Sequence, residues 1–218
     1  MRNVDHVFAV DQRIFDQYAG RYDAALTEHL HYRGPALLLE AVTSALARQA
    51  RPIRFESLLD LGCGTGLAGA VFRPFAAQLV GVDLSAAMIA RAEAKGDYDR
   101  LVVGNLAAFL SDEIAKAAQY DLVPAADVFV YVNDVAPVLA DIARGVAPRG
   151  VVAFTVETHS GAGVTLLPTL RFAHGEPYLR DAMAAAGLKL IALEHAAIRT
   201  EKGTPVVGLV VVAITART

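Results

Sequence analysis

The sequence Leu59-Asp60-Leu61-Gly62-Cys63-Gly64-Thr65-Gly66 ends an apolar strand in an acidic residue and continues with alternating glycines. Glycine adopts positive φ at little cost and has no Cβ, so the backbone here can turn tightly and approach a ligand closely. The apolar segment 67–72 follows and predicts a helix whose first N–H groups are free. The pattern predicts a strand, a glycine loop and a helix that together bind a nucleotide-type cofactor.

A second strand and helix follow directly. The apolar run 78–82 ends at Asp83, and Leu84 and Ser85 then open a helix that contains Met88. An acid at the tip of a second strand is placed to accept hydrogen bonds from two ribose hydroxyls. We therefore expect Asp83 to bind the ribose of the cofactor.

The rest of the chain predicts one α/β domain over residues 1–218. Apolar residues at three- and four-residue spacing between positions 11 and 49 predict two amphipathic helices, which form a helical cover over 1–50. Residues 51–218 then form a Rossmann-like core. Its strand-like runs alternate with helical stretches, which indicates a parallel sheet covered on both faces. We expect these strands at 57–61, 79–82, 101–103, 120–126 and 151–156.

Two features qualify this parallel pattern. Residues 188–194 and 206–214 are strand-like runs joined by a segment too short for a crossover helix, so they must pair antiparallel. The expected sheet therefore has seven strands, mostly parallel, with a C-terminal antiparallel hairpin. Pro124 falls inside the fourth strand, where it cannot donate a ladder hydrogen bond, so either the strand is shorter than 120–126 or it has a bulge there, and we expect the bulge.

Composition excludes several classes of protein. No stretch reaches the roughly 18 apolar residues that a membrane span needs, and the N-terminus lacks the pattern of a secretory signal. A single cysteine agrees with a reducing compartment, so we expect a cytoplasmic protein. The net charge of −3 disfavours a nucleic-acid partner. The sequence leaves the oligomeric state open, including a homodimer.

The motifs at 60–66 and 81–85 resemble those of class I methyltransferases that use S-adenosylmethionine (SAM). A terminal antiparallel hairpin is also typical of that fold. The segment 64–69 satisfies the G-x-G-x-x-G pattern of dinucleotide-binding domains as well. Asp60 argues against the dinucleotide, because a carboxylate ahead of the glycines repels a pyrophosphate but suits the ammonium group of SAM.

Four further segments, 15–23, 30–35, 125–131 and 199–206, resemble a bacterial group of predicted methyltransferases that are often fused to tetratricopeptide repeats. The resemblance covers nearly the whole chain and implies methyl transfer from SAM, with S-adenosylhomocysteine (SAH) as product. This chain lacks the repeats and with them an obvious protein-docking module. A small-molecule acceptor is therefore the favoured partner.

The resemblance also implies a set of cofactor-binding residues. The first motif would lie along the methionine part of SAM, residues of the second and third strand ends around ribose and adenine, and aromatic residues of the first helix over the cofactor. Some of these residues have a plain structural alternative: Asn105 as a loop residue, Met88 and Tyr22 as core residues, and Cys63 as a packing residue. The residues are Asp60, Gly62, Cys63, Gly64, Asp83, Leu84, Met88, Asn105, Leu106, Tyr18 and Tyr22.

Three residues are candidates for catalysis. Asp127 follows the fourth strand, where the carboxyl edge of the sheet should meet the cleft, and its alternative is a helix cap or a structural acid. His159 and His174 lie in segments expected to border the acceptor pocket, and each could act as a base near neutral pH or as a structural hydrogen-bonding residue. No spacing of His, Asp or Glu resembles a metal site.

Three functions remain open at this point. The favoured one is a SAM-dependent methyltransferase with a small-molecule acceptor. The second is an NAD(P)-dependent oxidoreductase that uses 64–69 as its fingerprint. The third is a protein that binds SAM without catalysing methyl transfer.

Overall fold

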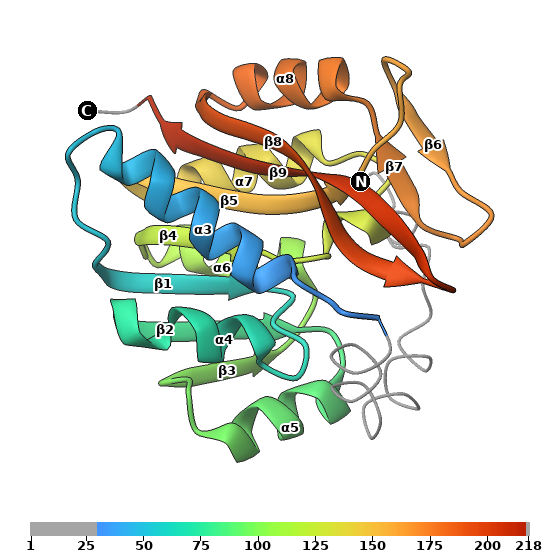
Figure 1. Ribbon diagram of the computed structural model, residues 1–218. Coiled ribbons are helices and arrows are strands. Elements are labelled where there is room, and N and C mark those ends of the chain that lie inside the picture. Colours follow the sequence, from blue (N-terminus) through green and yellow to red (C-terminus); the bar gives the residue numbers. More distant parts are fainter. Residues whose placement is uncertain (1–29, 217–218) are drawn as a thin grey trace.

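The computed structural model describes residues 30–216 and shows a central sheet between two layers of helices (Figure 1). Five parallel strands form its main part, in the order β3-β2-β1-β4-β5. Their bounds are Phe55–Leu61 for β1, Ala76–Asp83 for β2, Arg100–Val103 for β3, Tyr120–Ala125 for β4 and Val146–Glu157 for β5.

The C-terminal hairpin completes the sheet beside β5. Strand β9 (Thr204–Thr215) pairs antiparallel with β5, and β8 (Leu188–Glu201) pairs with the other side of β9. The predicted parallel sheet with an antiparallel C-terminal hairpin is confirmed. The hairpin is longer than predicted, because its connection is only Lys202-Gly203, both with positive φ, as a tight two-residue turn requires.

A second, short hairpin was not predicted. Strands β6 (Val164–Leu166) and β7 (Phe172–His174) pair antiparallel, and β7 joins the end of β5 at the register pair Glu157 and Ala173. The sheet therefore has nine strands in place of seven. Runs of three residues carry too little periodicity to be recognised in a sequence.

The irregularity of β4 lies away from Pro124. The register against β5 shifts between Tyr120 and Leu122, whereas Pro124 stays in register with Ala153. On the other side, β4 pairs with β1 only at Leu122, so Pro124 lies beyond the last paired position of that ladder. The missing N–H is tolerated there, and the prediction of a bulge at the proline was wrong.

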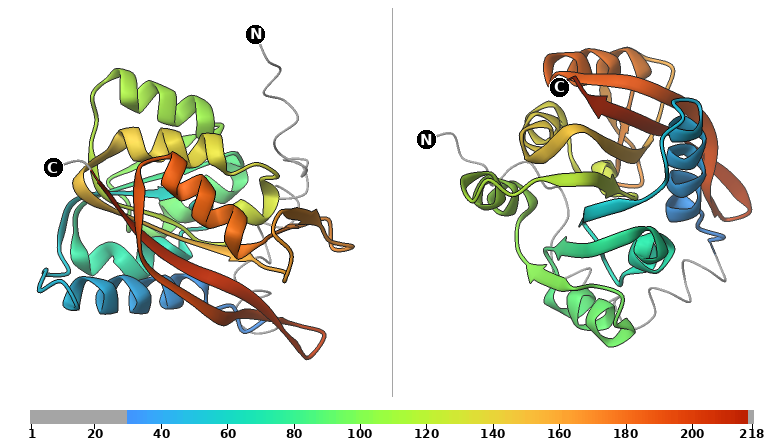
Figure 2. Two further views of the ribbon diagram at one scale, coloured as in Figure 1. Left: turned by 90° about the horizontal axis from the view of Figure 1, so that it is seen from above. Right: turned by 90° about the vertical axis from the view of Figure 1, so that its left-hand side faces the viewer.

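Helices cover both faces of the sheet (Figure 2). Apolar residues of α3 and α4 pack on one face, those of α6, α7 and α8 on the other, and α5 lies beside β2 and β3. The helices are α3 (Gly34–Ala47), α4 (Leu67–Phe72), α5 (Ala86–Lys95), α6 (Leu106–Ala115), α7 (Ala136–Gly145) and α8 (Glu176–Ala185), with short 3₁₀ helices at Arg73–Phe75 and Phe129–Tyr131.

Part of the predicted helical cover is confirmed by α3, which carries Pro35 in its first turn as expected. The predicted first helix, with Tyr18 and Tyr22, lies outside the described residues. Within residues 30–216, no helix is long and apolar enough to cross a membrane.

Candidate functional site

The glycine loop after β1 has the backbone that its sequence predicts. Gly62, Gly64 and Gly66 all have positive φ, and Gly66 is the left-handed residue that begins α4. At Gly62 a Cβ would also lie only 2.6 Å from a methyl carbon of Val128. Conformation and space therefore both require glycine at this position.

Asp83 ties this loop to the next helix from the end of β2. Its carboxylate accepts a hydrogen bond from the Gly64 N–H at 3.0 Å and another from the Ser85 N–H at 2.9 Å. Ser85 in turn caps α5 by accepting from the Met88 N–H. The acid expected at the tip of the second strand thus stands beside the glycine loop, and it orders the loop as well.

Asp60 is buried at the end of β1, with 1% of its surface exposed. Its Oδ2 accepts a hydrogen bond of 2.6 Å from the Tyr98 hydroxyl. The pKa of Asp60 is raised to about 7. Burial raises it most, the hydrogen bond from Tyr98 lowers it in part, and the negative charge of Asp83 raises it further. The site therefore holds a carboxylate that ionises in the physiological range.

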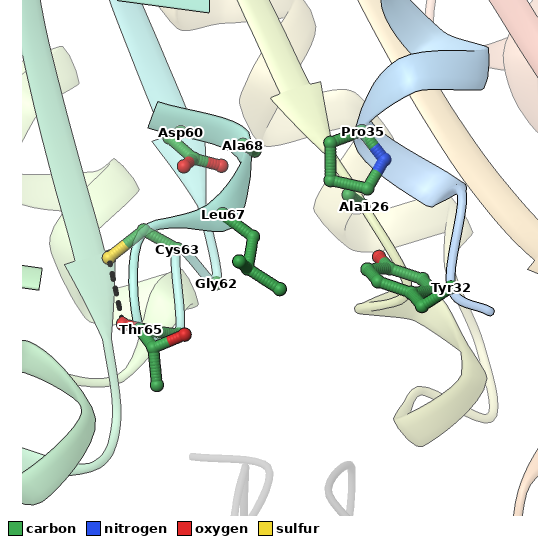
Figure 3. Close-up of a pocket in the computed structure, with 10 residues that line it drawn as sticks. Tyr32, Pro35, Asp60, Gly62, Cys63, Thr65, Leu67, Ala68 and Ala126 are labelled. Atoms are coloured by element: carbon green, nitrogen blue, oxygen red, sulfur yellow. Dashed lines mark hydrogen bonds between the residues drawn. The ribbon is translucent and has the colours of Figure 1, made fainter. Parts of the chain in front are cut away.

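A small pocket opens beside Asp60 (Figure 3). The glycine loop and the start of α4 form one side, while Tyr32 and Pro35, at the start of α3, stand on the other. Its lining residues are Tyr32, Pro35, Asp60, Gly62, Cys63, Gly64, Thr65, Leu67, Ala68 and Ala126. Four predicted cofactor residues, namely Asp60, Gly62, Cys63 and Gly64, meet here.

The third glycine of the dinucleotide-like pattern serves another purpose. A Cβ on Gly69 would lie 2.4 Å from the ring of Tyr98, and one on Gly81 would lie 2.8 Å from it. Gly69 therefore makes room for the residue that binds Asp60. Packing thus accounts for the third glycine of the G-x-G-x-x-G match at 64–69.

The predicted cofactor residues that follow β2 and β3 differ in exposure. Leu84 is half-buried, whereas Met88 and Leu106 are buried. Asn105 begins α6, where its side-chain oxygen accepts from the N–H groups of Ala107 and Ala108. This cap uses the side-chain oxygen of Asn105, a residue that the resemblance places around ribose and adenine, and its contact with the cofactor stays a prediction.

Cys63 behaves as a packing residue. Its side chain is buried, and burial, together with the negative charges of Asp60 and Asp83, raises the pKa of its thiol. A reactive thiolate is therefore disfavoured at this position.

Asp127 follows β4 directly after Ala126, which lines the pocket. It has a φ of 61° and its N–H donates to the Thr155 hydroxyl. Its carboxylate forms an ion pair with Arg199 of β8, at 3.1 Å. Asp127 does not cap a helix, and its placement at the carboxyl edge of the sheet agrees with the predicted one.

Arg199 is the centre of an ionic cluster at this edge. It is 1% exposed, and it also pairs with Glu157 at the end of β5 and, through Nε at 2.7 Å, with Glu201. Arg171 bonds the same oxygen of Glu201 at 2.5 Å. Three carboxylates and two guanidinium groups are thus held together, and none of these partners of Asp127 was singled out from the sequence.

The two candidate histidines lie away from the pocket beside Asp60. The ring of His159 accepts from the Gly161 N–H and donates to the Gly163 carbonyl, so both ring nitrogens are in use. His174 is completely buried, with Nε2 against the Val132 carbonyl at 2.9 Å, and burial lowers its pKa. The geometry favours structural roles for both residues, and their expected placement beside an acceptor pocket stays a prediction.

His159 instead lines a separate surface groove beside α8, with His195, Glu176 and Arg180. Within residues 30–216, no group of three or more His, Cys, Asp or Glu side chains could hold a metal ion.

Tyr98 and Tyr32 are two further site residues that the sequence did not reveal. Tyr98 lies in the loop before β3, and only its distant packing against Gly69 and Gly81 brings it to Asp60. Tyr32 lies just ahead of a helix expected from periodicity, and its position opposite the glycine loop follows from tertiary packing. No local pattern signals either contact.

Comparisons with known proteins show that the central part of the sequence is similar to methyltransferases. Residues 59–152 match the family model of a methyltransferase domain. The human methyltransferase-like protein 27 is 41% identical over 88 residues, which are 40% of this chain and 34% of that protein. The ubiquinone biosynthesis O-methyltransferase of Rhodopseudomonas palustris (strain BisB5) is 35% identical over 43% of this chain and 37% of its own. The match thus spans little more than a third of the length of these curated relatives.

Solved structures resemble the chain over a greater length. A magnesium protoporphyrin IX methyltransferase from Synechocystis PCC 6803 with bound SAH superposes with a TM-score of 0.66 at 16% identity, covering 95% of this chain and 100% of that one. The N-methyltransferase NodS of Bradyrhizobium japonicum WM9, in complex with SAH, gives 0.62 at 15% identity over 82% and 85%. Residues 59–152 thus match a methyltransferase domain, and the chain has the Rossmann-like fold of class I methyltransferases.

Proposed function

We propose that this protein is a SAM-dependent methyltransferase that acts on a small-molecule acceptor. One observation carries the proposal: two carboxylates, Asp60 and Asp83, stand at the ends of adjacent strands on either side of the glycine loop. A buried carboxylate in the pocket suits a ligand with an ammonium group and opposes one with a pyrophosphate. SAM has the ammonium group and no phosphate.

The residues of the site fit SAM by their chemistry. We assign the ammonium group to Asp60 and the ribose hydroxyls to Asp83, because a carboxylate can accept hydrogen bonds at both oxygens. Leu84, Met88, Leu106 and Asn105 belong around adenine in this proposal. Tyr18 and Tyr22 are proposed to close over the cofactor, as in similar enzymes.

Methyl transfer needs little covalent chemistry from the protein itself. SAM supplies an electrophilic methyl group on a sulfonium. The chain has to hold the acceptor in line with that methyl, exclude water and take up a proton where the acceptor has one to lose. We assign the proton to the carboxylate of Asp127, because it lies directly beyond Ala126 of the pocket, and the ion pair with Arg199 fixes its position.

Several observations support a small acceptor. The relatives include O-methyltransferases of ubiquinone biosynthesis and, at 29% identity over 125 residues, a malonyl-[acyl-carrier protein] O-methyltransferase from Enterobacter lignolyticus. The net charge of −3 disfavours a nucleic acid. We propose a single catalytic domain over 1–218 in the cytoplasm, a location supported by the single cysteine.

Calorimetric titration with SAM, SAH and NADH tests the cofactor. We expect micromolar binding of SAM and SAH and no heat from NADH. Asp83→Ala should weaken SAH by roughly ten- to a hundredfold, since it removes a hydrogen bond to a charged group worth about 1.5–3 kcal/mol. Asp141→Ala, which removes an acid from α7 paired with Arg144, is the matched control and should bind SAH as the parent does.

The outcomes separate the three functions. NADH binding without SAM binding would replace the proposal by an oxidoreductase. SAM binding without SAH production on any of a panel of hydroxyl, amine and thiol acceptors would indicate a protein that binds the cofactor without catalysis. Unchanged SAH affinity in a folded Asp83→Ala variant would refute the assignment of the ribose site.

A further inference from the structure

Tyr98 makes a contact to the cofactor pocket that the proposed function does not use. Its hydroxyl donates 2.6 Å to Oδ2 of Asp60, the buried carboxylate of the pocket. Tyr98 comes from the short loop between α5 and β3, on the far side of β2 from β1. A residue of an edge loop therefore reaches back to the end of the central strand.

Glycines fix the orientation of the Tyr98 ring. A Cβ placed on Gly66, Gly69 or Gly81 would lie 3.1, 2.4 or 2.8 Å from it, so the ring fills space that these three residues leave free. The glycines belong to the loop, to α4 and to β2, which are separate parts of the fold. A ring held from three sides directs its hydroxyl along one line, toward Asp60.

The contact with Tyr98 involves one of the two oxygens of the Asp60 carboxylate. Oδ2 is bound by Tyr98, and among the described residues no Arg or Lys forms an ion pair with Asp60. The other groups that act on Asp60 are the negative charge of Asp83 and its own burial, both of which oppose its ionisation. An ionised Asp60 in this site therefore lacks a cation, and the pocket that it lines is where one can be supplied.

We infer that Tyr98 is a positioning residue that orients Asp60 toward the ammonium group of the cofactor, so that the Asp60–Tyr98 pair selects ligands that carry an amino-acid end. The inference rests on the proposed function, because it takes SAM and SAH as the ligands. It adds Tyr98 to the site, a residue that neither of the two motifs contains.

A pair of ligands isolates this role. SAH and 5′-methylthioadenosine share the adenosine and the thioether, but only SAH has the ammonium and carboxylate groups. We expect Tyr98→Phe to weaken SAH about tenfold, since it removes a hydrogen bond to a charged group, and to leave 5′-methylthioadenosine within about twofold. Tyr178→Phe, which removes a tyrosine hydroxyl bound to Asp134 outside the pocket, is the matched control and should change neither affinity.

The pH profile gives a readout that a purely structural role would not move. The pKa of Asp60 is about 7 with the Tyr98 bond in place, and the ammonium group binds the ionised form. SAH affinity should therefore rise about tenfold between pH 6 and pH 8. Tyr98→Phe removes a hydrogen bond that stabilises the carboxylate, so its rise should occur at higher pH. Cys63 and Tyr98, the other titratable groups beside Asp60 apart from Asp83, have raised pKa values and stay protonated throughout.

The results decide the inference separately from the proposed function. Absence of SAH binding by the parent protein would refute the function itself. Equal losses of SAH and 5′-methylthioadenosine affinity in Tyr98→Phe, or no loss of either, would overturn the role of Tyr98. If that variant does not fold, Asp60→Asn is the alternative, and it should lose SAH selectively and abolish the pH dependence; an unselective loss would overturn the inference.

Discussion

Nη1 of Arg199 lies 3.1 Å from Oδ1 of Asp127, although the two residues are 72 positions apart in the chain. The contact joins the C-terminal hairpin to the end of β4. Arg199 also pairs with Glu157 of β5, so one buried guanidinium connects three strands at the carboxyl edge of the sheet. The acid that we assign to proton uptake is thus held by a residue of the hairpin.

Replacing Arg199 should cost considerable stability. Arg199→Met leaves Glu157 and Asp127 with a buried negative charge and no central cation, and breaking such a buried pair costs about 3–5 kcal/mol. Urea unfolding followed by circular dichroism measures the loss in the free energy of unfolding. Arg180→Met, from an exposed pair with Glu176, is the control and should cost less than about 1 kcal/mol. Equal losses in the two variants would show that the buried cluster stabilises the protein no more than an exposed ion pair does.

The parts of this structure that the sequence predicts are those governed by local patterns. The glycine loop, Asp83 at a strand tip and the alternation of strands and helices depend on neighbouring residues, so they can be recognised without a structure. Tyr98, Tyr32 and the partners of Asp127 depend on tertiary contacts between distant segments. The hairpin β6–β7 has strands too short for a periodic signal.

The histidines and Asn105 show a different limit. Their residue types suit the expected chemistry, but whether a side chain faces a pocket or the protein is decided by packing. His174 is buried in the core, and the side-chain oxygen of Asn105 accepts a hydrogen bond as a helix cap. Residue type and approximate position alone could not predict this burial or this capping bond.

Gly69→Ala tests the arrangement around Tyr98 from the opposite side. Alanine is the better helix former by about 1 kcal/mol, so α4 alone would gain stability from this change. The new Cβ would meet the Tyr98 ring at 2.4 Å and push the phenol away from Asp60. We expect SAH affinity to fall several-fold, as measured by calorimetry, because the 2.6 Å hydrogen bond is lost.

Gly96→Ala is a suitable comparison, because a Cβ there meets nothing within 4 Å and the cost is confined to its positive φ. It should lower stability without changing SAH affinity. Unaltered SAH binding by Gly69→Ala would mean that Tyr98 can move without loss of the site.

Glu113 should make the free energy of unfolding depend on pH in the acidic range. Burial alone would raise the pKa of Glu113, but hydrogen bonds from Arg100, Tyr120 and Lys116 outweigh that effect and lower it from 4.5 to about 2. A lowered pKa in the folded state stabilises the protein above pH 4.5, and the contribution is lost as the pH falls toward 2. Glu113→Gln should therefore lower the free energy of unfolding by about 1.5–3 kcal/mol at pH 7 and by much less near pH 2.

Urea titrations of both proteins across this pH range measure the difference. Glu93→Gln, at an exposed position of α5, serves as the control and should stay within about 0.5 kcal/mol of the parent throughout. A difference between Glu113→Gln and the parent that does not vary with pH would contradict the assignment of this stability to the ionised carboxylate.

Cys63 provides a probe of the pocket, because it is the only cysteine of the chain. Its thiol is 5% exposed, and burial with the nearby charges of Asp60 and Asp83 raises its pKa, so the thiolate is scarce at neutral pH. We expect a thiol reagent such as 5,5′-dithiobis(2-nitrobenzoate) to react at least about a hundredfold more slowly with the folded protein than with the protein in urea. SAH should slow the reaction further, since Cys63 lines the pocket that we assign to the cofactor. Fast labelling of the folded protein that SAH does not slow would place the cofactor away from the glycine loop.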